Sequence, residues 1–411
     1  QKAYGGSGFE EAIAIQQTSD GGYIVAGTTD SFGSGKKDFW VVKLDSNGDV
    51  EWQKAYGGGG DDWLHAIQQT SDGGYIVAGT TYSFLESGWD AGNGWVLKLD
   101  PNGNIEWQKA VPMAGGLQKI YDIRQTSDGG YIAVGTTWDA YGPLYYYDLW
   151  VVKLDSDGHI QWQKAYGGGN WDIGFAVQQT SDGGYIVAGE TWSFGSAKIN
   201  LWVLKLDSDG DVEWQKAYSR GEDENGAKAI QQTSDGGYVV VGYTSDFGPD
   251  GTDDYDVWIL KLNSDGDVEW QKAYGGSYSD GASTIQQTSD GGYIVAAYTK
   301  SFGPVLDIYS YAWILKLDSN GDIPDCCAII EGDINVTSTS VEPVSTDVDV
   351  QTTSGSVVNT NAMARVTSAT PIKICYVVSN QPPVANFTYS PENPVVGQAV
   401  AFNASESYDP D

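Results

Sequence analysis

The sequence predicts an all-β protein whose main part is a six-bladed β-propeller. An eight-residue segment of the type Q-Q-T-S-D-G-G-Y begins at positions 16, 68, 124, 178, 231 and 286, at spacings of 52, 56, 54, 53 and 55 residues. Each copy is joined to a W-V-x-K-L segment and, in most units, to an E-W-Q-K-A-Y segment, which gives four strand signals per unit. Four antiparallel strands repeated at this spacing are typical of propeller blades, and no helical periodicity competes with them.

Within the first unit, residues 14–18 and 23–29 are rich in β-formers and are joined by S-D-G-G, whose glycines permit a tight hairpin. Residues 39–44 and 50–56 form a second predicted hairpin around D-S-N-G-D. The related D-S-D-G-D turn at 207–211 places carboxylates at alternate positions, but its glycine comes too early for an EF-hand. We interpret these recurring segments as turn chemistry.

The number of strand signals predicts how the ring closes. Six copies of the first three strands are present, but only five complete copies of the fourth follow them, and the sixth unit breaks off at Ile323 and Pro324. Residues 1–6, Q-K-A-Y-G-G, match the missing strand. We therefore expect the N-terminal segment to pair with the sixth blade and close the ring.

Two segments resemble known families. The repeat T-S-D-G-G-Y-I-V-A-G followed by W-V-V-K-L-D-S-N-G-D-V-E-W-Q-K-A-Y-G-G resembles the secreted propeller repeats of archaeal and bacterial surface proteins, related to delta-sixty repeats, and covers residues 1–323. Residues 382–411, which begin P-P-V-A-N-F-T-Y-S-P, resemble the opening of a PKD domain, an immunoglobulin-like sandwich. The later W-D-F-G-D-G segment of that family is absent from the chain.

Three domains follow from these boundaries: the propeller at 1–323, a Ser/Thr/Val-rich region at 324–380, and the first strands of a PKD domain at 381–411. The middle region shows loose period-two alternation and is expected to be a small β-region or an extended stalk. A disulfide from Cys326 or Cys327 to Cys375 would close it into a loop.

The charge of the chain excludes several classes of partner. With 55 acidic and 22 basic residues the formal net charge is -33, which repels nucleic acid and anionic membrane surfaces. No apolar run approaches the roughly 20 residues that span a bilayer. The oxidisable cysteines and three glycosylation-type triplets at Asn335, Asn386 and Asn403 favour an extracellular, secreted or cell-surface location.

The repeat separates scaffold tryptophans from those free for another role. Eleven tryptophans share one of two strand positions and are predicted to be structural. The others fall in variable loops, which strand alternation places together on one face of the disc. With two neighbouring tyrosines they are the predicted ligand-binding residues: Trp63, Trp89, Trp138, Tyr145, Tyr146, Trp171 and Trp192. Either they pack over the blade ends, or they form a stacking platform for sugar rings or a partner protein.

The loops of the fifth unit carry an acidic cluster on the same face. It is interpreted either as a solvated loop or as a calcium site, because calcium takes carboxylate and carbonyl oxygens from flexible loops. No cofactor is required by the sequence. The candidate metal ligands are Asp250, Asp253, Asp254 and Asp256.

The sequence favours a non-catalytic binding function. Sialidases are also six-bladed propellers, but their carboxylate-binding arginine cluster has no counterpart here, since only Arg124, Arg220 and Arg365 are present. The two histidines, His65 and His159, form no triad or metal motif. We expect a cell-surface module that binds glycan or protein. The alternatives are a structural subunit that self-assembles by strand exchange, and a glycoside hydrolase, for which two suitably spaced carboxylates suffice.

Overall fold

The computed structural model describes residues 2–34, 36–84, 92–111, 117–138, 146–219, 221–245, 254–276, 278–301 and 310–323, and in addition the backbone of four short strands, β24 to β27. The regular elements of these residues are β-strands. Among them no helix is long and apolar enough to cross a membrane.

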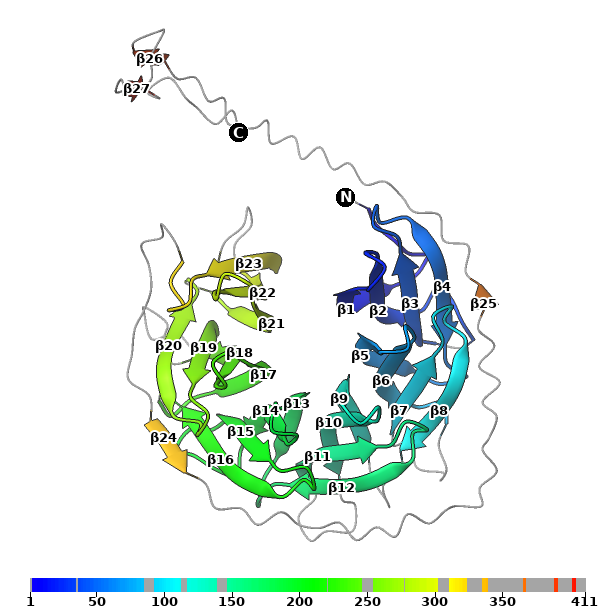
Figure 1. Ribbon diagram of the computed structural model, residues 1–411, viewed down its shortest axis with the longest axis horizontal. Coiled ribbons are helices and arrows are strands. Elements are labelled where there is room, and N and C mark those ends of the chain that lie inside the picture. Colours follow the sequence, from blue (N-terminus) through cyan, green and yellow to red (C-terminus); the bar gives the residue numbers. More distant parts are fainter. Residues whose placement is uncertain are drawn as a thin grey trace. The chain divides into compact units, whose positions relative to one another are not determined.

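Strands β1 to β23 form six consecutive antiparallel sheets around a common centre, which we call blades 1 to 6 (Figure 1). In each blade the strands pair in chain order, and the first strand is the innermost (Figure 1). The prediction of an all-β, six-bladed propeller arrangement is confirmed.

The strand bounds repeat closely from blade to blade. Blade 1 comprises β1 (Glu10–Gln17), β2 (Tyr23–Thr29), β3 (Asp38–Leu44) and β4 (Val50–Tyr56); blade 2 comprises β5 (Asp62–Gln69), β6 (Tyr75–Thr81), β7 (Asn93–Leu99) and β8 (Ile105–Val111); blade 3 comprises β9 (Gln118–Gln125), β10 (Tyr131–Trp138), β11 (Tyr147–Leu154) and β12 (Ile160–Tyr166). Blade 4 comprises β13 (Asp172–Gln179), β14 (Tyr185–Thr191), β15 (Asn200–Leu206) and β16 (Val212–Ser219); blade 5 comprises β17 (Asn225–Gln232), β18 (Tyr238–Thr244), β19 (Asp256–Leu262) and β20 (Val268–Tyr274); blade 6 comprises β21 (Asp280–Gln287), β22 (Tyr293–Thr299) and β23 (Tyr311–Leu317).

Blade 6 has three strands among the described residues. Its predicted fourth strand, residues 1–6, stays a prediction, because Gln1–Gly5 belong with Ala369–Asp411 to a compact unit separate from Gly6–Ser368. In the larger unit, β24 (Asn335–Ser338) pairs with β16, and β25 (Arg365–Val366) pairs with β4. In the smaller unit, β26 (Thr388–Ser390) pairs with β27 (Ala401–Asn403), and the PKD assignment of this segment stays a prediction.

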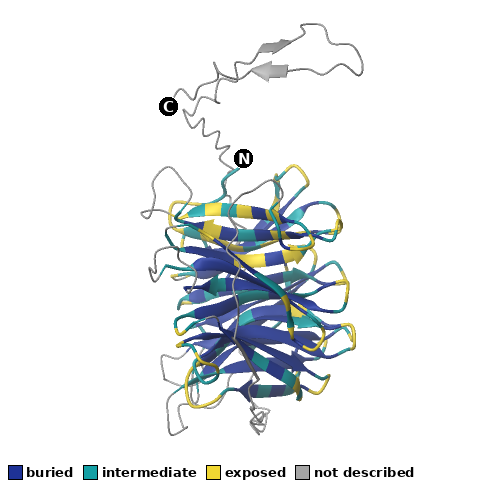
Figure 2. Cartoon of the chain, turned by 90° about the vertical axis from the view of Figure 1, so that its left-hand side faces the viewer, coloured by how far each residue is buried: buried dark blue, intermediate teal, exposed yellow. Residues whose placement is uncertain are grey.

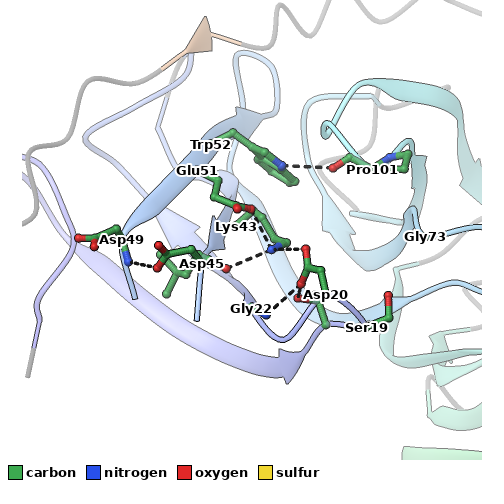
Figure 3. Close-up of polar contacts among 12 residues, drawn as sticks. Ser19, Asp20, Gly22, Lys43, Asp45, Asp49, Glu51, Trp52, Gly73 and Pro101 are labelled. Carbon is green, nitrogen blue, oxygen red and sulfur yellow. Dashed lines mark hydrogen bonds and ion pairs between the residues drawn. The ribbon is translucent and has the colours of Figure 1, made fainter. Parts of the chain in front are cut away.

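Both hairpin turns of a blade are held by an aspartate that accepts backbone hydrogen bonds, as predicted. Asp20 Oδ1 accepts hydrogen bonds from Thr18 Oγ1 and from Gly22 N, the latter at 2.9 Å. Asp45 Oδ1 accepts hydrogen bonds from the N–H groups of Asn47 and Asp49, both at 2.8 Å (Figure 3). These contacts give the recurrent aspartate of the turns a structural role.

A buried lysine joins the two hairpins of a blade. The Lys43 side chain is 4% exposed, and its ammonium lies 2.9 Å from both Asp20 Oδ2 and Glu51 Oε2 (Figure 3). Burial by itself would lower the pKa of Lys43, but the hydrogen bonds with these two carboxylates more than offset it, so the pKa is raised. The same arrangement recurs at Lys98, Lys205 and Lys261.

Consecutive blades contact each other through the outer strand of one blade, which packs against and hydrogen-bonds to the strands and turns of the next. The Trp52 ring makes an edge contact with Tyr75 at 5.9 Å, and Trp52 Nε1 donates to Pro101 O at 3.2 Å (Figure 3). Tyr56 OH donates to Gly103 O at 2.7 Å. Each of the five hydrophobic clusters accordingly combines residues of two consecutive blades, and buried residues predominate in most of the strands in Figure 2, whereas some strands at the top of the view carry exposed residues.

The two outermost faces of the series are exposed. Ile15 on blade 1 is 68% exposed, whereas Ile67 at the same position of blade 2 is buried against blade 1. Ile314 on blade 6 is 61% exposed, whereas Ile259 at the same position of blade 5 is buried. The first and sixth blades therefore carry apolar faces of the kind that the other blades bury between them.

Buried carboxylates meet at the junction of blades 1 and 2, near the variable-loop ends of the strands. Asp38 begins β3 and Asp62 begins β5, and both side chains are fully buried. Gly57 lies between them, and a Cβ there would overlap both Asp38 Oδ1 and Asp62 Oδ2. The recurrent Y-G-G that ends the outer strand thus has a steric cause, since the junction leaves no room for a side chain.

Substitution Lys43→Met tests the lysine that joins the hairpins. Methionine keeps the apolar stem but leaves Asp20 and Glu51 without their cation. Because both carboxylates are about half exposed and therefore screened by solvent, we expect the free energy of unfolding to fall by only about 2 kcal/mol. The free energy of unfolding is measured by denaturant titration. The exposed Lys36, 3.5 Å from Asp61, is the control, and Lys36→Met is expected to cost less than about 0.5 kcal/mol. Equal effects of the two variants would contradict the structural role of Lys43.

Substitution Gly57→Ala tests the close approach at the carboxylate junction. The added methyl group must displace Asp38 or Asp62, so we expect a loss of roughly 3 kcal/mol in the free energy of unfolding. Gly59 is the matched control, because nothing lies within 4 Å of its added Cβ, and Gly59→Ala is expected to be neutral or slightly stabilising. Thermal and denaturant unfolding of both variants distinguish the two results.

Candidate functional site

Four aromatic side chains of blades 3 and 4 lie together at the variable-loop ends of their strands, and we call them the aromatic platform: Trp138, Tyr147, Trp171 and Trp192. The Trp138 and Tyr147 ring centroids are 6.4 Å apart, and those of Tyr147 and Trp171 are 5.8 Å apart at an interplanar angle of 86°. Trp171 and Trp192 follow at 6.1 Å. Trp171 is 46% exposed, and the other three are half-buried.

Strand register brings these rings together. Trp138 is the last residue of β10 and pairs with Tyr147, the first residue of β11, because this hairpin is one residue pair longer than its counterparts. Trp171 directly precedes β13, and Trp192 directly follows β14. Trp192 N donates to Trp171 O at 2.8 Å. Backbone pairing therefore positions Trp138 beside Tyr147 and Trp171 beside Trp192. The packing of blade 3 on blade 4 brings these two pairs of rings together.

The remaining predicted aromatic residues lie elsewhere. Trp63, at the start of β5, stands apart from the platform and packs its ring under the Lys37 ammonium at 3.6 Å. Tyr146 precedes β11 and is half-buried. Trp89 and Tyr145 lie outside the described residues. Sequence reasoning thus named three of the four platform residues as ligand-binding candidates, and Tyr147 completes the group.

The predicted calcium ligands are partly described. Asp254 Oδ1 accepts a hydrogen bond from Ser279 Oγ at 3.2 Å. Asp256 begins β19 and is buried, and its burial together with the charges of Asp280 and Asp254 raises its pKa to about 7. In the described parts of the chain no group of three or more His, Cys, Asp or Glu side chains has the arrangement of a metal site. The calcium site stays a prediction, because Asp250 and Asp253 lie outside these parts.

The predicted modification sites fall mostly outside the described residues, among them Cys326, Cys327, Cys375 and Asn386. Asn335 begins β24, and Asn403 ends β27. The disulfide and the glycosylation therefore stay predictions.

A second group of residues, which the sequence reasoning missed, lies along the inner strands. Each inner strand is irregular at one shared position, where the register with its neighbour shifts. A β-bulge of this kind re-aims one side chain and is common near binding sites. No residue type recurs there: the position is occupied by Ile13, His65, Tyr121, Phe175, Lys228 and Ser283.

The bulged side chains of blades 2 to 5 contact one another in succession. His65 and Tyr121 have ring centroids 5.2 Å apart, and Tyr121 and Phe175 follow at 5.1 Å. The Lys228 ammonium lies 3.7 Å from the centroid of the Phe175 ring, a cation–π contact. Burial lowers the pKa of His65 to about 4, so its imidazole is neutral at pH 7.

Lys228 also meets a buried carboxylate. Glu190, in β14, is 4% exposed, and its Oε1 accepts hydrogen bonds from Lys228 Nζ at 2.8 Å and from Tyr243 OH at 3.0 Å. Burial and the charge of Glu190 raise the pKa of Tyr243. Gly226 makes room for this group, since a Cβ there would overlap Glu190 Oε1. A buried charge is stable only when paired in this way.

The signal for this inner group was present in the sequence. Threonine occupies the Glu190 position in blades 1 to 3, and the bulge position carries an ammonium group only at Lys228. Charged residues that occur once at a repeated strand position are therefore as informative as unregistered tryptophans in loops. The inner group offers a fixed ammonium and carboxylate with aromatic faces, and the platform offers an exposed indole.

Solved structures show a weak similarity to this chain, whereas family models and curated proteins show none. No protein-family model matches the chain, and no curated protein matches it in sequence. Among solved structures the chain is similar to Sqt1 from Chaetomium thermophilum, at 14% identity over 77% of this chain and 71% of that chain with a TM-score of 0.43. It is similar to a thermostable family-43 glycoside hydrolase, at 14% identity over 66% and 95% with a TM-score of 0.38, and to a xylan beta-1,4-xylosidase from Bacillus halodurans C-125, at 10% identity over 82% and 90% with a TM-score of 0.32.

At these identities and TM-scores the likeness carries no argument about activity. The resemblance of the repeat to secreted surface-protein propellers and of residues 382–411 to a PKD domain stays a prediction. The strand pairing of the chain itself identifies a propeller of six consecutive blades.

Proposed function

We propose that the protein is an extracellular, non-catalytic binding module whose aromatic platform holds the sugar rings of a glycan. The observation that carries this proposal is Trp171, an indole that is 46% exposed yet held in edge contacts by Tyr147 on one side and Trp192 on the other. Its position is therefore set by neighbouring rings before any ligand arrives. Preorganised aromatic surface of this kind binds with little loss of side-chain entropy.

The chemistry of the platform favours a glycan as the ligand. Sugar rings present C–H faces that stack on indole and phenol rings, and hydroxyl groups that accept hydrogen bonds from indole N–H or phenol O–H groups at their edges. The strong negative charge of the chain disfavours polyanions. Neutral oligosaccharides are therefore the first ligands to test.

The carboxylates beside the platform do not support a glycosidase. Asp172 lies next to Trp171 in the chain, but it is fully buried and its Oδ2 accepts hydrogen bonds from Gly168 N at 2.9 Å and Ser193 Oγ at 2.7 Å. A catalytic carboxylate must reach the scissile bond. The same buried aspartate occurs as Asp62 and Asp280 at junctions that lack the platform, which favours a scaffold role.

Substitution Trp171→Ala tests the proposed function. The purified chain is screened on an array of neutral oligosaccharides, and the dissociation constant of the best ligand is measured by calorimetry or by tryptophan fluorescence. Loss of the central ring is expected to remove roughly 2 kcal/mol of binding free energy, which raises the dissociation constant about 30-fold.

Trp63→Ala is the matched control, because Trp63 is half-buried at the end of a strand and does not contact the platform. It is expected to bind the oligosaccharide like the unmodified chain. Circular dichroism and unfolding curves verify that both variants are folded. Undiminished binding by folded Trp171→Ala, or equal losses in the two variants, would show that the platform is not the glycan site.

A further inference from the structure

Three of the five junctions between consecutive blades contain a pair of aspartates, and the other two contain neutral amides at the same positions. The first member of each pair is the first or second residue of the third strand of one blade, and the second member begins the inner strand of the next. The aspartate pairs are Asp38 with Asp62, Asp148 with Asp172, and Asp256 with Asp280; the amide pairs are Asn93 with Gln118, and Asn200 with Asn225.

The aspartate pairs share one geometry, in which a glycine separates the two carboxyl groups. At Gly57, Gly167 and Gly275 an added Cβ would overlap an oxygen of the first aspartate and lie against an oxygen of the second. Each of these glycines follows a tyrosine at the end of an outer strand. Outer strands that reach an amide junction instead continue with proline or serine, at Pro112 and Ser219. Glycine and paired aspartates therefore occur together.

The two members of the first pair, Asp38 and Asp62, differ in the number of hydrogen bonds that their carboxyl oxygens accept. Asp62 accepts hydrogen bonds from Gly58 N at 2.9 Å, from Ser83 Oγ at 2.6 Å and from the Thr81 hydroxyl. Asp38 Oδ2 accepts one from Ser34 N at 2.9 Å, but Asp38 Oδ1 is buried without a hydrogen-bond partner. In the third pair, Asp280 likewise accepts hydrogen bonds from Gly276 N and Ser301 Oγ.

The counter-ions of five of these carboxyl groups can be judged from the described part of the chain. Among the described residues, no lysine, arginine or histidine forms an ion pair with Asp38, Asp62, Asp172, Asp256 or Asp280. The charged groups that face the pairs are carboxylates: Asp62 faces Asp38, and Asp280 and Asp254 face Asp256. Two ionised carboxylates in such a site would repel each other at low dielectric, and a proton on one of them removes this repulsion.

We propose that the pairs Asp38–Asp62 and Asp148–Asp172 are proton-linked locks, each of which holds its blade junction closed while the pair keeps one proton and weakens the junction when both members ionise. In the first junction the proton resides on Asp38, the member with the unsatisfied oxygen. The amide junctions carry uncharged side chains at the same strand positions, so asparagine at the Asp38 position is compatible with the fold.

The titration range follows from burial. Burial and the neighbouring Asp62 raise the pKa of Asp38 to about 7, and burial raises the pKa of Asp172 to about 6. An unfolded aspartate has a pKa near 4, so between about pH 4 and pH 7 the folded chain binds more protons than the unfolded chain. Stability contributed by the locks is thus complete below about pH 4 and is lost as the pH rises through 7.

One of the locks lies beside the aromatic platform. Asp148 follows Tyr147, and Asp172 follows Trp171, so the two carboxyl groups belong to the strands that position the platform from blades 3 and 4. If the proposed glycan binding holds, opening of this junction separates the rings, and binding weakens as the pH rises. This consequence rests on the proposed function, whereas the lock itself does not.

The test is the pH dependence of unfolding, which requires no ligand. Denaturant midpoints of the chain are measured from pH 5 to pH 8 beside those of the double variant Asp38→Asn with Asp172→Asn. For the unmodified chain we expect the folding equilibrium constant to fall about tenfold or more across this range, and for the double variant we expect a much flatter profile. The exposed turn carboxylates Asp209 and Asp265 are the charge-matched control, and replacing both of them by asparagine should keep the slope of the unmodified chain.

Three results would overturn the lock. A flat profile for the unmodified chain, or an equal slope for the double variant and the chain, would show that the pairs do not titrate in this range. A midpoint at pH 8 that rises with calcium chloride in the unmodified chain but not in the double variant would assign the pairs to a cation instead of a proton. Glycan binding that is independent of pH, together with the expected unfolding profile, would leave the lock intact and remove only its effect on the platform.

Discussion

The structure depends on the contact between consecutive blades. Each blade is a sheet with apolar residues on both faces, and a sheet of this kind cannot bury either face by itself. The outer-strand tryptophan of one blade packs on the tyrosine of the next, as Trp52 does on Tyr75, and the same strand donates hydrogen bonds to the next hairpin. Every buried cluster therefore belongs to two blades, and Ile15 and Ile314 at the two ends of the series are exposed within the described part of the chain.

This contact divides the residues of the repeat between scaffold and function. Positions that every junction uses are occupied by the same residue types in nearly all blades, and substitutions there are constrained by both neighbours. Positions that only some junctions use are free to diverge, and they carry the platform around Trp171 and the Glu190–Lys228 pair, both of which join two blades. The aromatic platform and the Glu190–Lys228 pair lie where the repeat is least regular, because packing between blades constrains the residue type least at those positions.

The junctions also differ in charge while they keep one backbone frame. Asp38 and Asn93 begin the third strand of successive blades, and the next inner strand begins with Asp62 in one case and Gln118 in the other. A pair of amide side chains is uncharged at every pH. A pair of carboxyl groups at the same positions carries one negative charge while it holds one proton, and two negative charges once that proton is lost. Because amide junctions and carboxyl junctions alternate, neighbouring junctions of one fold respond differently to pH. One carboxyl junction lies between blades 3 and 4, which carry the platform.

By itself the sequence determined that the chain forms four-stranded blades. The period of the repeat, the turn glycines and the strand alternation are local properties, and they occur in every unit. It also determined that loop tryptophans such as Trp138, Trp171 and Trp192 stand outside the scaffold, since they match no shared register. Only the tertiary structure decided that Tyr147 contacts Trp138 and Trp171, that Trp171 contacts Trp192, and that Trp63 packs against Lys37, because contacts between loops depend on how adjacent blades pack. The pairing of Asp38 with Asp62 across Gly57 was likewise invisible in the chain, since it joins strands of two blades and follows from burial, which no local pattern records.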